Sequence, residues 1–291
     1  MTQLHLVGVH GIRQRDTNDI KLANDWNEAL TRGMAMHVGP HAVVPTVVAP
    51  YYGKVFPRGF LKLGEDEAVD LTSIDDEELE FILDALEVHT PPVPGQQPYA
   101  GTLGMPPRTN PRLVQLLARA DRRFGNGVGR LLVNRISEVY GYFRDDDKAE
   151  EVRHRVRDAV EQTGATMIIA HSLGSVVVYD MFQRGQIPAA DSGTVSQLVT
   201  LGSPLAWLPI QRNLGIDTTA SLQLPTGIAW LNVFDSHDPV TAGIGLSGLA
   251  REVIDAPVDN EGDPHSAECY LEQKPVALSV QSALPCAPQT L

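Results

Sequence analysis

The sequence predicts an α/β protein with a mainly parallel central sheet and helices on both faces. Short apolar segments of strand-like composition alternate with longer segments whose apolar residues recur at helical spacing. Strands that alternate with helices favour a parallel sheet, because a crossover helix must return the chain to the same end of the sheet. The chain has 291 residues and 43% hydrophobic content, which is enough to form a substantial core.

The expected elements follow one another along the chain. The first strand covers residues 4–9, and a helix at 20–38 leads to a second strand at 43–49, where Pro45 favours an edge position or a strand start. After an interruption, the alternation resumes. We expect further strands at 166–170, 195–201, 228–234 and 252–256, and further helices at 148–163 and 174–184.

Residues 51–147 interrupt this alternation. They comprise an acidic helix-like segment at 75–88, a stretch rich in Pro and Gly at 91–111, and a mostly basic amphipathic segment at 112–142. We interpret the chain, residues 1–291, as a single domain with 51–147 as an insertion. Two interpretations of the insertion stay open: a cap over the functional site, or peripheral helices with a disordered loop.

Charge and composition exclude several classes of function. The formal net charge of −13 disfavours non-specific binding to nucleic acid or to an anionic membrane, though not to a neutral lipid or a small ester. No apolar run is long enough to cross a membrane, and the N-terminal residues lack a secretory signal, so we expect a cytoplasmic protein. Cys269 and Cys286 are expected to be free thiols, with a disulfide between them as the alternative. No Cys/His cluster has metal-site spacing, so no metal is expected.

The strongest functional signal surrounds Ser172. An apolar strand reaches this serine and a helix begins directly after it, while Ala170 and Gly174 are small enough for a sharp turn. Such a turn raises the hydroxyl above the sheet and places the amide of Leu173 at a helix N-terminus, where it can bind an oxyanion. The alternative is an ordinary turn in which Ser172 caps the helix.

The run A-H-S-L-G at 170–174 resembles the nucleophile elbow of α/β-hydrolase lipases and esterases, some of which carry alanine in place of the first glycine. The resemblance covers roughly residues 1–50 and 148–285 and does not cover the insertion. It implies an α/β-hydrolase fold and a serine nucleophile whose acid and histidine partners follow in that order along the chain.

The resemblance extends to both partners. His265, in D-P-H-S-A at 263–267, resembles the H-S loop that carries the histidine of many lipases, whereas His237 is interpreted as a bystander. Asp238, in D-P-V, resembles the turn that carries the acid, and its role would be to orient the histidine. Asp235 is the alternative acid, or it could brace the turn through hydrogen bonds to the backbone.

Two further segments complete the expected site. The turn His10-Gly11-Ile12 resembles the H-G turn of lipases, with Ile12 as the second oxyanion donor beside Leu173; a plain glycine turn is the alternative. The run 198–205 resembles the strand ending in G-S-P of lipase-like esterases. The residues expected to line the substrate site are His10, Gly11, His171 and Pro204.

The expected reaction is acyl transfer to water through an acyl-enzyme on Ser172, with His265 as base and no cofactor. A small-molecule or lipid ester is the expected substrate, on the strength of the resemblance. Thioesterase, amidase or peptidase activity with the same residues is an alternative, as is a non-catalytic binding protein of the same fold. The oligomeric state is left open.

Overall fold

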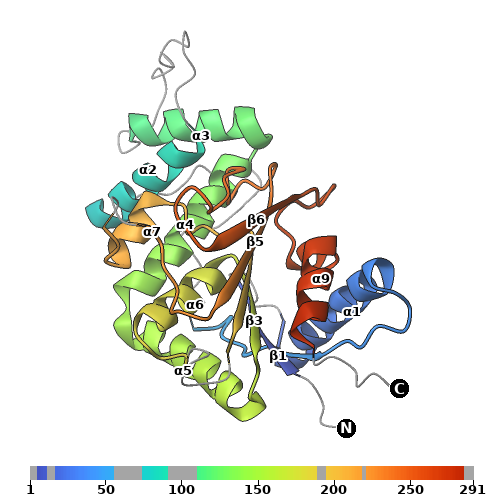
Figure 1. Ribbon diagram of the computed structural model, residues 1–291. Helices are drawn as coiled ribbons and strands as arrows, with labels where there is room; N and C mark the ends of the chain where they lie inside the picture. Colours follow the sequence, from blue (N-terminus) through green and yellow to red (C-terminus); the bar gives the residue numbers. More distant parts are fainter. Residues whose placement is uncertain are drawn as a thin grey trace, which may run out of the picture.

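The computed structural model describes residues 5–11, 17–55, 74–90, 110–188, 195–217 and 221–284. Within these ranges, six parallel strands form one sheet in the order β2-β1-β3-β4-β5-β6 (Figure 1). The strands are β1 (His5–Val9), β2 (Thr46–Val48), β3 (Met167–His171), β4 (Gln197–Leu201), β5 (Ala229–Asp235) and β6 (Val253–Val258). The expected parallel α/β architecture is therefore confirmed, and β2 takes the edge position that Pro45 predicted.

Helices cover both faces of the sheet (Figure 1). One face carries α1 (Asp19–His37), α8 (Ala267–Leu271) and α9 (Lys274–Ala283). The other carries α2 (Asp76–His89), α3 (Pro111–Phe124), α4 (Val128–Arg144), α5 (Asp146–Thr163), α6 (Leu173–Gln183) and α7 (Leu208–Asn213). None of the described helices is long and apolar enough to cross a membrane.

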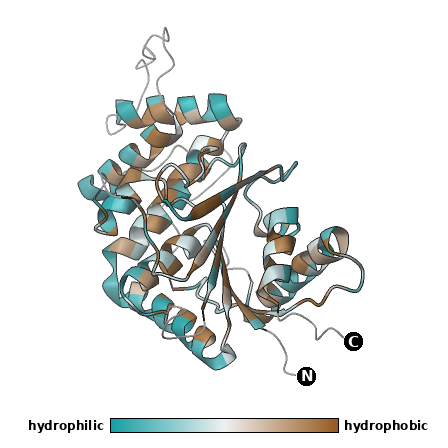
Figure 2. Ribbon diagram, viewed as in Figure 1, coloured by the Kyte–Doolittle hydropathy of each residue, from teal (hydrophilic) through white to brown (hydrophobic). Residues whose placement is uncertain are grey.

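The alternation of side chains along β3 divides the core into two clusters. Met167 and Ile169 belong to the cluster beneath α1, α8 and α9, while Ile168 and Ala170 belong to the cluster on the opposite face. All residues of β3 are buried because helices cover both faces, which explains why the strand is apolar from Met167 to Ala170 rather than alternating. Figure 2 shows this hydrophobic sheet between helices whose outer faces are hydrophilic.

The amphipathic segment expected at 112–142 consists of two helices, α3 and α4. Asn110 accepts hydrogen bonds from the amides of Arg112 and Leu113 and so begins α3. Gly125 and Gly127 both have positive φ, at 112° and 83°, and this backbone ends α3 and redirects the chain into α4. Most of the Pro- and Gly-rich stretch, residues 91–109, lies outside the described residues.

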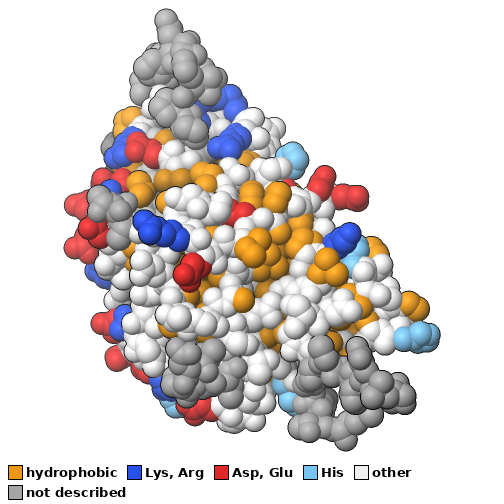
Figure 3. Space-filling model, viewed as in Figure 1, with side chains coloured by type: hydrophobic (Ala, Val, Ile, Leu, Met, Phe, Trp, Pro, Cys, Tyr) orange, Lys and Arg blue, Asp and Glu red, His pale blue; other side chains and the backbone are white. Residues whose placement is uncertain are grey.

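The three described helices of the 51–147 segment share the main core with the sheet. Their buried residues, among them Ile82, Leu116 and Ile136, belong to the same cluster as Val9 of β1 and Val177 of α6. Charged side chains gather on the outer side of this layer (Figure 3). They join α2 to its neighbours through the pairs Asp75–Arg144, Glu87–Arg112 and Asp84–Arg212. Because exposed pairs contribute only about 0–1 kcal/mol each, apolar packing holds these helices in place.

Candidate functional site

The candidate site lies where successive strands end. In a parallel sheet the carboxyl ends of all strands meet at one edge, and the loops there can bring distant residues together. Ser172 follows β3, Gly202 follows β4, Asp238 lies in the turn after β5, and His265 lies in the loop after β6. The topology therefore brings to one edge residues that are up to 93 positions apart in the chain.

Ser172 occupies a strained turn between β3 and α6. Its φ of 54° and ψ of −125° lie where residues other than glycine are rarely found. A Cβ atom on Gly174 would come within 2.8 Å of the His10 carbonyl oxygen and even closer to that of Val9, so this position requires glycine. The amide of Ser172 donates to the Leu201 carbonyl (3.0 Å), and the hydroxyl of Ser175 donates to the Ser172 carbonyl (2.6 Å). The backbone of the turn is thus held from both sides.

Ser172, His265 and Asp238 are hydrogen-bonded in a line. The Oγ of Ser172 lies 3.0 Å from Nε2 of His265, and Nδ1 of His265 lies 2.7 Å from Oδ2 of Asp238. All three side chains are buried. Since a carboxylate accepts at Nδ1, the proton of the neutral imidazole sits on Nδ1, and Nε2 accepts from the serine hydroxyl. This arrangement can take the hydroxyl proton and so activate the serine as a nucleophile.

The two candidate acids have different contacts. Asp238 contacts His265, and its other oxygen accepts the amide of Val240 (2.8 Å). Asp235 instead accepts backbone amides at both oxygens, from His237 and from Asn260, each at 2.6 Å. Asp235 therefore braces the turn and ties it to the loop that leads to His265, while Asp238 is the carboxylate that orients the imidazole.

Burial sets the protonation of the pair. Desolvation lowers the pKa of His265 well below its usual value, and the positive charge of Arg135 on α4 lowers it further. Desolvation raises the pKa of Asp238 to about 6, against hydrogen bonds that favour its charged form. Both values lie below 7, so at neutral pH the imidazole is neutral and the carboxylate is ionised. This is the state in which His265 can act as a general base.

His171 and His10, which were expected to line the substrate site, support the backbone of the site. Nε2 of His171 donates to the His265 carbonyl (3.0 Å), which fixes the loop that carries the imidazole. The ring of His10 is fully buried and stacks on Tyr52 at a centroid distance of 3.8 Å. Its Nδ1 donates to the Gly11 carbonyl (2.6 Å) and its Nε2 accepts the amide of Tyr52 (3.1 Å). Both ring nitrogens of His10 are therefore engaged within the protein, so it braces the turn.

The turn after β1 lies against the serine. A Cβ atom on Gly11 would lie 2.8 Å from the Cβ of Ser172 and 3.3 Å from its Oγ, so only a glycine lets the chain pass this close. Leu173, the first residue of α6, has an amide with no acceptor within its helix, as expected for an oxyanion donor. The other expected donor, Ile12, lies outside the described residues.

Pro204 is buried in the segment between β4 and α7, where its carbonyl accepts the amide of Trp207 (2.9 Å). The neighbouring Ser203 is buried and hydrogen-bonded to Ser175 through their hydroxyls (2.7 Å), which links this segment to the first turn of α6. Sequence reasoning missed Ser175 and Ser203, and it also missed Tyr270, whose hydroxyl donates to Asp238 (2.8 Å). Nothing in the spacing of these residues marks them, because their contacts depend on how distant loops pack.

Among the described residues, Asp235, His237 and Asp259 form a group whose potential metal-ligating atoms lie within 4.8 Å of one another. The hydrogen bonds that Asp235 accepts from two backbone amides account for its placement without an ion. Cys269 is a free thiol, and Cys286 lies outside the described residues.

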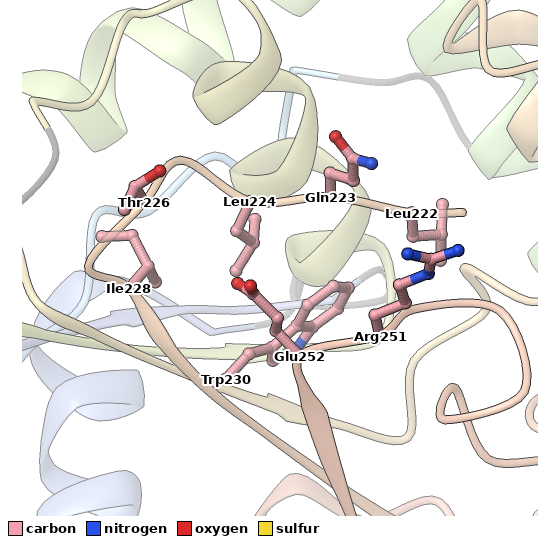
Figure 4. A pocket seen from close by; sticks show the side chains of 8 residues that line it. All are labelled: Leu222, Gln223, Leu224, Thr226, Ile228, Trp230, Arg251 and Glu252. Carbon is pink, nitrogen blue, oxygen red and sulfur yellow. The ribbon is translucent and has the colours of Figure 1, made fainter. Parts of the chain in front are cut away.

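A second feature is a cavity of about 280 Å³, whose lining side chains are drawn in Figure 4. Its lining residues are Leu222, Gln223, Leu224, Thr226, Ile228, Trp230, Arg251 and Glu252. Trp230 lies near the start of β5, whereas the candidate site follows Asp235 at its end, roughly 16 Å further along the strand. The cavity is therefore separate from the Ser172 site.

Comparison with known proteins finds no matching family model, no matching curated protein and no matching solved structure.

Proposed function

We propose that the protein is a serine hydrolase of the α/β-hydrolase type that cleaves carboxylic esters through an acyl-enzyme on Ser172. The single observation that supports this most directly is the continuous line of hydrogen bonds from Ser172 through His265 to Asp238. The strained strand-to-helix turn at the serine and the chain order of serine, acid and histidine also favour this family.

In the proposed reaction, Oγ of Ser172 attacks the ester carbonyl carbon while Nε2 of His265 takes the hydroxyl proton. The negative charge that forms on the carbonyl oxygen is stabilised by the amide of Leu173 at the start of α6. His265 then gives its proton to the departing alcohol, and the acyl group stays on Ser172. Water, deprotonated by the same imidazole, attacks the acyl group and releases the carboxylic acid and free Ser172. Asp238 stabilises the imidazolium during both steps.

Esters are the proposed substrates because the A-H-S-L-G turn resembles that of lipases and esterases. Thioesters and amides react by the same route, so the activity assay includes all three linkages.

The test is labelling with a fluorophosphonate probe, which reacts with an activated serine, alongside hydrolysis of p-nitrophenyl esters of increasing chain length and of thioester and amide substrates. We expect the wild type to be labelled and Ser172→Ala to lose both the label and roughly 10⁴-fold or more of kcat/KM. Ser282→Ala, on α9, is the matched control and should label like the wild type.

A folded wild-type protein that neither labels nor cleaves any ester, thioester or amide would overturn the proposal and favour a binding protein of this fold. Labelling that persists in Ser172→Ala would place the nucleophile elsewhere. Circular dichroism of both variants verifies that each is folded.

A further inference from the structure

We propose that Tyr270 is a positioning residue that holds the carboxylate of Asp238. By donating a hydrogen bond to this carboxylate, Tyr270 also sets how strongly His265 binds a proton. The inference rests on the proposed function for its consequence in catalysis. The contact itself belongs to the geometry of the site and can be tested without an activity assay.

The hydroxyl of Tyr270 has two partners that leave it a single orientation. It donates to Oδ2 of Asp238 at 2.8 Å and accepts the amide of Asp235 at 2.9 Å. Because the amide must donate, the proton of the hydroxyl is directed at the carboxylate. The phenol ring is fully buried in the core cluster beneath α1, α8 and α9, so the hydroxyl cannot turn to water.

The position of Tyr270 in the fold couples it to both partners of the serine. It lies on α8, which begins at Ala267, two residues after His265, and is capped by Ser266. Its hydrogen bonds reach across to the end of β5 and to the turn that carries Asp238. The residue therefore joins the histidine loop to the acid turn.

The same carboxylate oxygen that orients His265 also accepts from Tyr270. Oδ2 of Asp238 receives Nδ1–H of His265 at 2.7 Å and the phenol O–H at 2.8 Å. A hydrogen bond to a charged oxygen spreads its charge and weakens its attraction for a neighbouring imidazolium. Removing the phenol hydroxyl should therefore leave Asp238 a stronger partner for protonated His265.

Other charged and titratable groups also act on the pair, and they stay unchanged in the comparison between variants. The ring of His171 on β3 donates to the backbone carbonyl of His265, and the charge of Arg135 on α4 lowers the pKa of His265. Asp235, whose amide binds Tyr270, is the remaining carboxyl group on the acid turn. A Tyr270→Phe variant removes the two hydrogen bonds of the phenol hydroxyl, to the carboxylate of Asp238 and from the amide of Asp235, and leaves these charged groups in place.

The test is a titration of the His265 imidazole by NMR with isotope-labelled histidine, its signal assigned with His265→Gln. In Tyr270→Phe we expect the midpoint of this titration to rise by roughly half to one pH unit, given the strength of hydrogen bonds to charged groups. The acid limb of kcat/KM should move upward by the same amount. If Tyr270→Phe fails to fold, 3-fluorotyrosine at position 270, a stronger donor, should move the midpoint downward.

Tyr142→Phe is the matched control. Tyr142 is a buried tyrosine whose hydroxyl donates to a buried carboxylate, Asp180, at 2.7 Å, but this pair lies between α4, α5 and α6. Its loss should leave the His265 midpoint where it is in the wild type. A control that moves the midpoint equally would show a general loss of structure and would overturn the inference.

The two proposals fail in different ways. If the wild type is neither labelled nor active but the His265 midpoint shifts in Tyr270→Phe, the proposed function is wrong and the role of Tyr270 stands. If the wild type is labelled and active but the midpoint is the same in Tyr270→Phe and the wild type, the role of Tyr270 is wrong and the proposed function stands.

Discussion

Ser172 holds its hydroxyl toward His265 by means of a backbone conformation that costs stability. A side chain other than glycine at φ 54° and ψ −125° is strained by about 1–3 kcal/mol. The hydrogen bonds from Ser172 to Leu201 and from Ser175 to Ser172 hold the turn in this shape. The residue that the proposed chemistry needs therefore lowers the stability of the protein, and these hydrogen bonds offset part of the loss.

This strain can be measured by comparing two variants that both lack the hydroxyl. We expect Ser172→Gly to be more stable than Ser172→Ala by about 1 kcal/mol, because glycine relieves the strain but loses more chain entropy on folding. The measurement is the free energy of unfolding in urea at pH 7. Both variants lose the hydrogen bond to His265, so the difference reports the backbone alone. Equal stability, or a more stable alanine variant, would contradict the strained conformation.

At the scale of elements, the site depends on how closely α6 approaches β1. Gly174, in the first turn of α6, packs against the carbonyl groups of Val9 and His10 at the end of β1. The turn that follows β1 carries Gly11 past the Ser172 side chain. The spacing between one helix and one strand end thus sets the distance from the nucleophile to the turn after β1.

Gly174→Ala tests this spacing. The added Cβ would collide with backbone oxygens that cannot move aside as a side chain can, so we expect a loss of about 3 kcal/mol or more in unfolding free energy. Fluorophosphonate labelling should fall with it, since the turn after β1 must shift away from Ser172. Gly248→Ala is the control, because nothing lies within 4 Å of its added Cβ. A stable and fully labelled Gly174→Ala protein would refute the close approach.

The strands and the serine turn could be predicted from sequence because their signals are local. An apolar run such as β3, followed by Ser172 between small residues, specifies a buried strand and a sharp turn within a few positions. The sequence indicated an amphipathic segment at 112–142 but not where it divides, and Gly125 and Gly127 with positive φ separate α3 from α4. Tyr270 was missed because its contact with Asp238 joins α8 to the turn after β5, and no periodicity encodes such a contact.

For the whole molecule, the buried ionisable groups of the site determine how stability depends on pH. His10, His171 and His265 are all buried, and desolvation lowers the pKa of each, that of His10 to about 4. Each takes up a proton near pH 6.5 when the chain unfolds but not while it is folded. Their contribution to stability is therefore present above pH 6.5 and is lost as the pH falls toward their folded-state values. Asp238, with a pKa raised to about 6, has the opposite effect: it makes the folded protein more stable as the pH falls from about 6 to about 4.

The fall in stability between pH 6.5 and pH 4 should be attributable to single histidines. Each buried histidine lowers the free energy of unfolding by up to about 1.4 kcal/mol per pH unit as the pH falls over this range. The carboxyl group of Asp238 offsets the contribution of only one of the three histidines. We expect His10→Gln to remove one such contribution, so that its unfolding free energy changes less steeply with pH than that of the wild type, whatever its stability at pH 7. Urea unfolding at several pH values between 4.5 and 7 measures the slopes.

His41→Gln, at an exposed histidine, should keep the wild-type slope. An unchanged slope in His10→Gln would mean that His10 gains its proton as readily in the folded protein as in the unfolded chain. That result would contradict the interpretation of His10 as a buried, neutral imidazole that braces Gly11 beside Ser172.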